Sequence, residues 1–123
     1  MPALARGETV ICDRFIDSTY AYQTAGQGVD ETLFRHIAEP ALLGRFPDAV
    51  FVIDVPPEIA RQRLLNGDKN GAEAYYESLG QAFFIKARAA FLRRAEEEKR
   101  AVYHVMDGTE NAEALSRRIL TCL

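Results

Sequence analysis

The sequence has no excess of basic residues and no long hydrophobic run, and each absence excludes a class of protein. Its 15 Lys and Arg stand against 18 Asp and Glu, which gives a formal net charge of -3. A dedicated nucleic-acid binder needs a basic face for phosphate contacts, so we expect no nucleic-acid partner. A transmembrane helix needs about 20 mostly apolar residues, and no stretch approaches that length. The net charge does not exclude a small anionic ligand, because one arginine can hold a phosphate.

Cysteine is also scarce. Cys12 and Cys122 lie at opposite ends of the chain, and two cysteines without a signal peptide indicate reduced thiols rather than a disulfide framework. The first residues contain no apolar run of the kind that directs secretion. We therefore predict a cytoplasmic protein with no membrane partner.

The remaining composition is that of one modest globular domain. The 123 residues are 48% hydrophobic and 27% charged, which argues against disorder. A chain of this length can bury one continuous core.

Short β-branched runs alternate with longer segments of helical period. The runs at 9–12, 49–55 and 101–107 are predicted strands. Helices are predicted between and after them, at 17–28, 30–42, 57–66, 76–100 and 110–123. Strands and helices that alternate with short connections predict an α/β fold, in which a parallel sheet is flanked by helices.

Two helix starts are predicted from capping residues. Asp17 or Ser18 is expected to cap the first helix, and Asp30 the second. The apolar face of the second helix would contain Leu33 and Ile37, together with Leu42 further along.

Acidic residues end or follow all three predicted strands. They are Asp13, Asp54 and Asp107, and Asp13 is followed directly by Arg14. Ligands of parallel α/β sheets bind beyond the carboxyl ends of the strands. Burying a charged pair there without partners would cost several kcal/mol. We therefore interpret Asp13 and Arg14 as functional, with an internal ion pair that steers the turn as the alternative.

Polar and aromatic side chains follow at the predicted helix start, where free N–H groups suit an anionic or polar ligand. They are Ser18, Thr19, Tyr22 and Gln23. Taken singly, Ser18 is explained as an N-cap and Tyr22 as a core aromatic, and Gln23 carries no signal.

Taken together, the run from Val10 to Gln23 closely resembles the signature of the thymidylate kinases. It has an apolar strand, Asp-Arg-aromatic, a Ser/Thr pair and then Ala-Tyr-Gln. Later segments are similar to the family in the same order, so that the resemblance covers essentially the whole chain. They are Gly26-Gln27-Gly28, Phe46-Pro47-Asp48, the turn at 54–58, the helix with Phe83, Arg88 and Phe91, and the segment 105–108.

The resemblance implies a P-loop nucleoside-monophosphate-kinase-like fold and a reaction. Family members transfer the γ-phosphoryl group of ATP to thymidine monophosphate (dTMP) with Mg²⁺, giving dTDP and ADP. By position, Arg14 resembles the arginine that holds the acceptor phosphate. Asp13 resembles the carboxylate that organises the water shell of Mg²⁺.

The resemblance also implies roles in substrate binding. Ser18 and Thr19 correspond to a polar pair that reaches toward the thymine edge, and Gln23 to a secondary polar contact. Tyr22 resembles the aromatic that packs against the deoxyribose, where a ribose would carry its extra hydroxyl.

Two departures from the family pattern matter. No Gly-x-x-x-x-Gly-Lys-Ser/Thr motif occurs in the 123 residues, so we interpret the chain as a single partial kinase domain that lacks the first two strands. Within it, 1–28 would form the dTMP-binding region and 66–77 the lid. Relatives usually place several arginines in the lid, whereas Lys69 is its only base here. Arg63 could stack on adenine, with a solvated helix arginine as the equal alternative.

The absent strands lead to an expectation about assembly. In the family, one of them lies between the strands matching 10–12 and 50–55. We therefore expect these two segments either to pair directly or to associate between copies. The alternative is that the missing strand lies in another segment of a larger molecule. The chain alone is expected to be inactive. Because family enzymes are homodimers, the resemblance also implies a homodimer for the full-length protein. The alternatives are a non-catalytic α/β fragment or pseudoenzyme that acts as an interaction module, and a kinase for another nucleotide.

Overall fold

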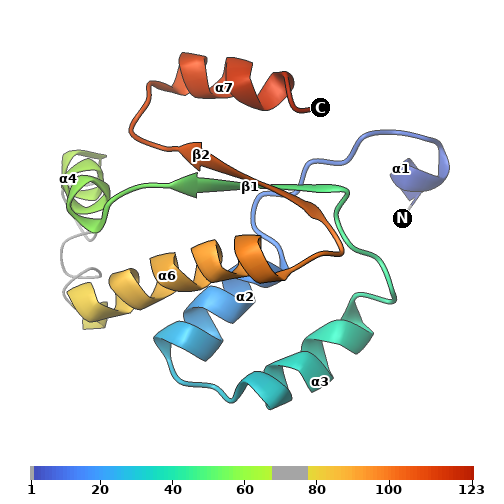
Figure 1. The fold of residues 1–123 in the computed structure, drawn as a ribbon, viewed down its shortest axis with the longest axis horizontal. Coiled ribbons are helices and arrows are strands. Elements are labelled where there is room, and N and C mark those ends of the chain that lie inside the picture. Colours follow the sequence, from blue (N-terminus) through green and yellow to red (C-terminus); the bar gives the residue numbers. More distant parts are fainter. Residues whose placement is uncertain (1, 68–77) are drawn as a thin grey trace.

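The computed structural model describes residues 2–67 and 78–123. These residues form an α/β arrangement of helices around a small sheet (Figure 1). In chain order the elements are α1 (Pro2–Ala5), α2 (Ile16–Thr19), the π-helix η1 (Tyr20–Gly26), α3 (Glu31–Ala41), β1 (Ala49–Asp54), α4 (Pro57–Gly67), α6 (Gln81–Glu97), β2 (Val102–Asp107) and α7 (Ala112–Leu120). Among the described helices, none combines the length and apolar character that a membrane span requires.

The sheet consists of β1 and β2, which run parallel. Their register aligns Ala49 with Val102 and Asp54 with Asp107. In Figure 1, α6 and α7 lie on opposite sides of the two strands, and α4 follows the carboxyl end of β1. The predicted parallel sheet with flanking helices is therefore confirmed.

The predicted strand at 9–12 is wrong. The segment has no regular secondary structure, and Val10 and Ile11 are 53% and 88% exposed. Within the described residues β1 pairs with β2 alone, so direct pairing between 10–12 and β1 does not occur. An apolar run becomes a strand only where a neighbouring strand satisfies its backbone N–H and C=O groups, and the described residues supply none here.

The main core lies between α6, η1 and α3. Its buried residues are Tyr20, Ala21, Phe34, Ala87 and Ala90. Tyr20 is 2% exposed, and its ring meets that of Phe34 edge-on at a centroid distance of 5.2 Å. The short side chains of Ala87 and Ala90 allow α6 to approach these aromatic rings closely.

The α3 helix differs from its sequence prediction in the face that it buries. Asp30 caps the helix as predicted, because its carboxylate accepts a hydrogen bond from the Leu33 backbone N–H at 2.9 Å. Phe34 is the buried residue, whereas Leu33 and Ile37 are 51% and 65% exposed. The periodicity of the sequence located an apolar face on α3, but it did not show which side of the helix packs on the core. The contact between Phe34 and Tyr20 decides this.

Gly108, the residue after β2, is enclosed by the end of β1. A Cβ at this position would lie 2.4 Å from Val55 Cγ2 and 2.9 Å from the Asp54 carbonyl oxygen. We expect Gly108→Ala to lower the free energy of unfolding by roughly 1–3 kcal/mol, since the backbone must move to admit the methyl group. Urea unfolding followed by circular dichroism measures this. Ser116→Ala is the control, because it places the same alanine at an exposed position of α7, where surface substitutions change stability by at most about 0.5 kcal/mol. Equal stability of the two variants would contradict the prediction.

Candidate functional site

Arg14 has an unusual backbone conformation just before α2. Its φ is 72°, in the left-handed region that costs a non-glycine residue about 1–3 kcal/mol and that clusters at functional sites. Its Nε donates to Ser18 Oγ at 3.4 Å. Its guanidinium carbon lies 4.7 Å from the centroid of the Tyr22 ring. The structure thus brings together three of the residues singled out in the sequence.

Tyr22 is held by aromatic side chains of α6. It stacks on Phe83, with ring centroids 5.7 Å apart and an interplanar angle of 8°. Phe91 meets the same ring edge-on at 6.1 Å. Tyr22 therefore packs on the core, as the sequence allowed, and its ring also faces the guanidinium of Arg14. Its role against the deoxyribose stays a prediction.

The helix that contains Tyr22 is π-helical from Tyr20 to Gly26, which the sequence did not predict. Such helices occur frequently at functional sites.

The prediction that Asp17 or Ser18 caps the first helix is wrong. The N-cap of α2 is Phe15, which makes no side-chain capping bond, and Asp17 lies buried within the helix.

Asp17 holds α2 against two distant elements, a role that the sequence did not reveal. Its Oδ1 accepts from Arg94 Nε at 2.9 Å and from the Tyr103 hydroxyl at 2.8 Å. Burial raises the pKa of Tyr103, and its hydrogen bond to Asp17 raises it further. The partners lie 77 and 86 residues away, so no local pattern could have indicated them.

The other predicted site residues of this segment are exposed. They are Asp13, Thr19 and Gln23. Their side chains make no hydrogen bond with the described residues, in contrast to Arg14 and Ser18. The structure therefore leaves these side chains accessible, and their roles stay predictions.

Arg63 lies apart from this group. Its Nη1 donates to the Gly108 carbonyl oxygen at 2.6 Å, and its Nη2 to the Thr109 carbonyl oxygen at 3.4 Å. It is therefore hydrogen-bonded to the turn after β2 while the residue itself stays exposed, and its role toward adenine stays a prediction. Lys69 and most of the predicted lid, 66–77, lie outside the described residues.

A second charged pair marks the carboxyl end of β1. Arg88 binds Asp54 with both branches of its guanidinium, at 2.6 and 2.8 Å. The hydrogen bond from Arg88 lowers the pKa of Asp54. A cavity of about 390 Å³ opens beside it, lined by Asp54, Pro56, Val105, Met106, Asp107 and Thr109. The acidic strand ends indicated this edge of the sheet, but the partner on α6 was not predicted.

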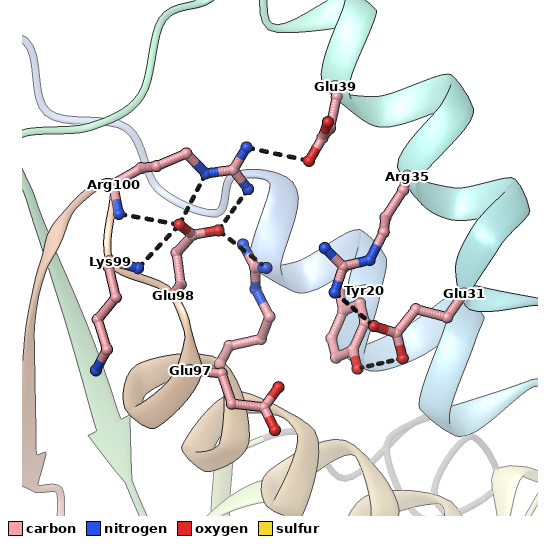
Figure 2. A pocket seen from close by; sticks show the side chains of 9 residues that line it. Tyr20, Glu31, Arg35, Glu39, Glu97, Glu98, Lys99 and Arg100 are labelled. Atoms are coloured by element: carbon pink, nitrogen blue, oxygen red, sulfur yellow. Dashed lines mark hydrogen bonds and ion pairs between the residues drawn. The ribbon is translucent and has the colours of Figure 1, made fainter.

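Another cleft, of about 370 Å³, lies between α3 and the carboxyl end of α6 (Figure 2). Figure 2 shows Arg100 between Glu39 and Glu98, and the Tyr20 hydroxyl directed at Glu31. Its arginines are already paired with carboxylates. We therefore interpret this cleft as an ion-pair network that joins two helices.

The described residues contain no cluster of three or more His, Cys, Asp or Glu that could hold a metal ion by themselves. Mg²⁺ in phosphoryl-transfer sites keeps several waters and uses one or two carboxylates together with the substrate phosphates. The exposed carboxylate of Asp13 fits such a water-mediated role.

The family model described as thymidylate kinase matches residues 1–119. The chain belongs to the thymidylate kinase family. The predicted resemblance is thereby confirmed.

Curated thymidylate kinases are similar along nearly the whole chain. That of Coprothermobacter proteolyticus is 38% identical over 97% of this chain and 58% of its own length. That of Pseudomonas putida strain GB-1 is 38% identical over 96% and 54%, and that of Pseudomonas fluorescens 42% over 89% and 50%. The chain thus spans about half the length of these thymidylate kinases.

Proposed function

We propose that this chain is the dTMP-binding part of a thymidylate kinase, which transfers the γ-phosphoryl group of ATP to dTMP and yields dTDP and ADP. The observation that carries the proposal is the placement of Arg14. A left-handed φ of 72° directs its guanidinium over Tyr22 and toward Ser18. Maintaining that backbone conformation costs free energy, which a binding role for the side chain explains.

Arg14 would bind the acceptor phosphate. A guanidinium offers several N–H donors to phosphate oxygens, and its charge offsets the repulsion between the two anionic substrates. Tyr22 would pack against the deoxyribose and exclude a ribose. Ser18, Thr19 and Gln23 would supply polar contacts to the nucleotide.

Asp13 would help to hold Mg²⁺ through water. When bound, Mg²⁺ neutralises charge that develops on the transferred phosphoryl group. For ATP we propose Arg63, whose guanidinium is fixed by two backbone carbonyls and presents a flat face for stacking. Lys69 stays the proposed lid cation.

The 123 residues contain no glycine-rich phosphate-binding motif, and such a loop normally cradles the phosphates of ATP. We therefore propose that the chain alone binds dTMP without turnover, and that turnover requires a polypeptide that also carries this motif. Cytoplasmic location and the homodimer of the family stay predictions.

Calorimetric titration with dTMP tests this proposal. Arg14→Ala is expected to weaken binding by about 10- to 100-fold, because a charge-assisted hydrogen bond contributes about 1.5–3 kcal/mol. Arg117→Ala is the control, since it removes the same charge from a residue whose side chain is 69% exposed on α7. Unchanged affinity in Arg14→Ala would contradict the proposed site. Equal affinity for dTMP and deoxyadenosine monophosphate would favour a kinase for another nucleotide.

A further inference from the structure

Phe83 lies where α6 meets the proposed dTMP site. It comes from the first turn of α6 and is 9% exposed. Its ring is nearly parallel to that of Tyr22, with an interplanar angle of 8°, whereas its edge-on contact is with Phe84. Tyr22 is thus in direct contact with both Phe83 and Arg14.

Gly26 also lies directly against the Phe83 ring. A Cβ at Gly26 would lie 2.3 Å from Phe83 Cε2 and 2.8 Å from Cδ2. No side chain can therefore occupy this position unless the ring moves. Gly26 ends η1, so Tyr22 and Gly26, which both lie against the Phe83 ring, belong to the same helix.

We propose that Phe83 is a positioning residue for dTMP binding, which acts through Tyr22 on Arg14. The inference rests on the proposed function, because it concerns the same site. Stacking on Phe83 fixes the plane of the Tyr22 ring, and this ring is the surface over which the Arg14 guanidinium lies. Without Phe83, the tyrosine can rotate and the arginine loses its support, so that both the phosphate contact and the selection against ribose weaken.

Phe83→Leu and Gly26→Ala test the inference in two different ways. The first removes the stacked ring, and the second retains it but displaces it. Each is expected to raise the dissociation constant for dTMP about three- to tenfold, as an aromatic pair contributes about 0.5–1.5 kcal/mol. The ratio of the dissociation constants of ribothymidine monophosphate and dTMP should also fall. In NMR spectra of the free protein, the Nε–Hε signal of Arg14 is the one that disappears in Arg14→Lys. This signal should show increased mobility of the Arg14 side chain in Phe83→Leu and in Gly26→Ala.

Phe34→Leu is the matched control, because Phe34 is 8% exposed and packs on Tyr20 rather than Tyr22. It should lower stability comparably without altering the Arg14 signal or the ribose ratio. If Phe83→Leu changes neither quantity relative to Phe34→Leu, the positioning role is overturned, while dTMP binding by the unmodified chain still supports the proposed function. If the unmodified chain binds no dTMP, the proposed function fails. The coupling of Phe83 to Arg14 is then judged from the NMR signal alone, and a changed Arg14 signal in Phe83→Leu would support it.

Discussion

Replacing Arg94 by methionine is expected to lower the free energy of unfolding by about 3–5 kcal/mol, because it leaves a buried carboxylate without its cation. The side chains of Arg94 and Asp17 are 11% and 7% exposed, and their closest atoms are 2.9 Å apart. Burial acts to lower the pKa of Arg94, but the hydrogen bond and charge of Asp17 outweigh it and raise the pKa. Methionine retains the length of the side chain, so the change reports the lost charge more than lost packing.

Urea unfolding at pH 7 measures this effect, and the chain supplies its own control. Arg93 is the neighbouring residue, and its side chain is 47% exposed where it contacts Glu31 at 3.2 Å. Arg93→Met should cost at most about 1 kcal/mol, as exposed ion pairs do. The double variant Arg94→Met with Asp17→Asn should recover much of the loss, since no unpaired charge remains and the amide oxygen can still accept from the Tyr103 hydroxyl. Comparable destabilisation by Arg93→Met and Arg94→Met would refute the prediction.

Acidification is expected to destabilise the protein through Glu98. Hydrogen bonding from the Arg100 side chain is the main cause that lowers the pKa of Glu98 from 4.5 to about 2; burial opposes it. Since the pKa is lower in the folded state, the stabilisation is fully present above about pH 4.5 and is lost as the pH falls toward 2. Its upper limit is roughly 3 kcal/mol.

Glu98→Gln should therefore lower the free energy of unfolding at pH 7 by up to that amount. The difference between the unmodified protein and the variant should shrink as the pH falls from 5 to 3, and urea unfolding at several pH values measures it. Glu97→Gln serves as the control, because Glu97 is 62% exposed and lies 3.8 Å from Arg93. A difference that stays constant over this pH range would show that Glu98 contributes packing rather than charge.

The sequence predicted much of the site from contiguous residues. Arg14, Ser18 and Tyr22 lie within nine positions, and the structure brings their side chains together. Such clustering was predictable because one turn and one helix start set their separation. The sequence indicated one partner of the bidentate contact between Asp54 and Arg88. It showed an acidic residue at the end of the strand, but not that Arg88 binds it.

By itself, the sequence determined the parallel strands at 49–55 and 101–107, most of the helices and the family, because these depend on local periodicity and on a contiguous motif. Only the tertiary structure decided which apolar segments are buried. Val10 and Ile11 remain exposed, because a strand needs a neighbour for its backbone hydrogen bonds. Only the tertiary structure joined Asp17 to Arg94 and Tyr103, since burying a charge depends on a partner that chain folding, rather than sequence proximity, brings within hydrogen-bonding distance.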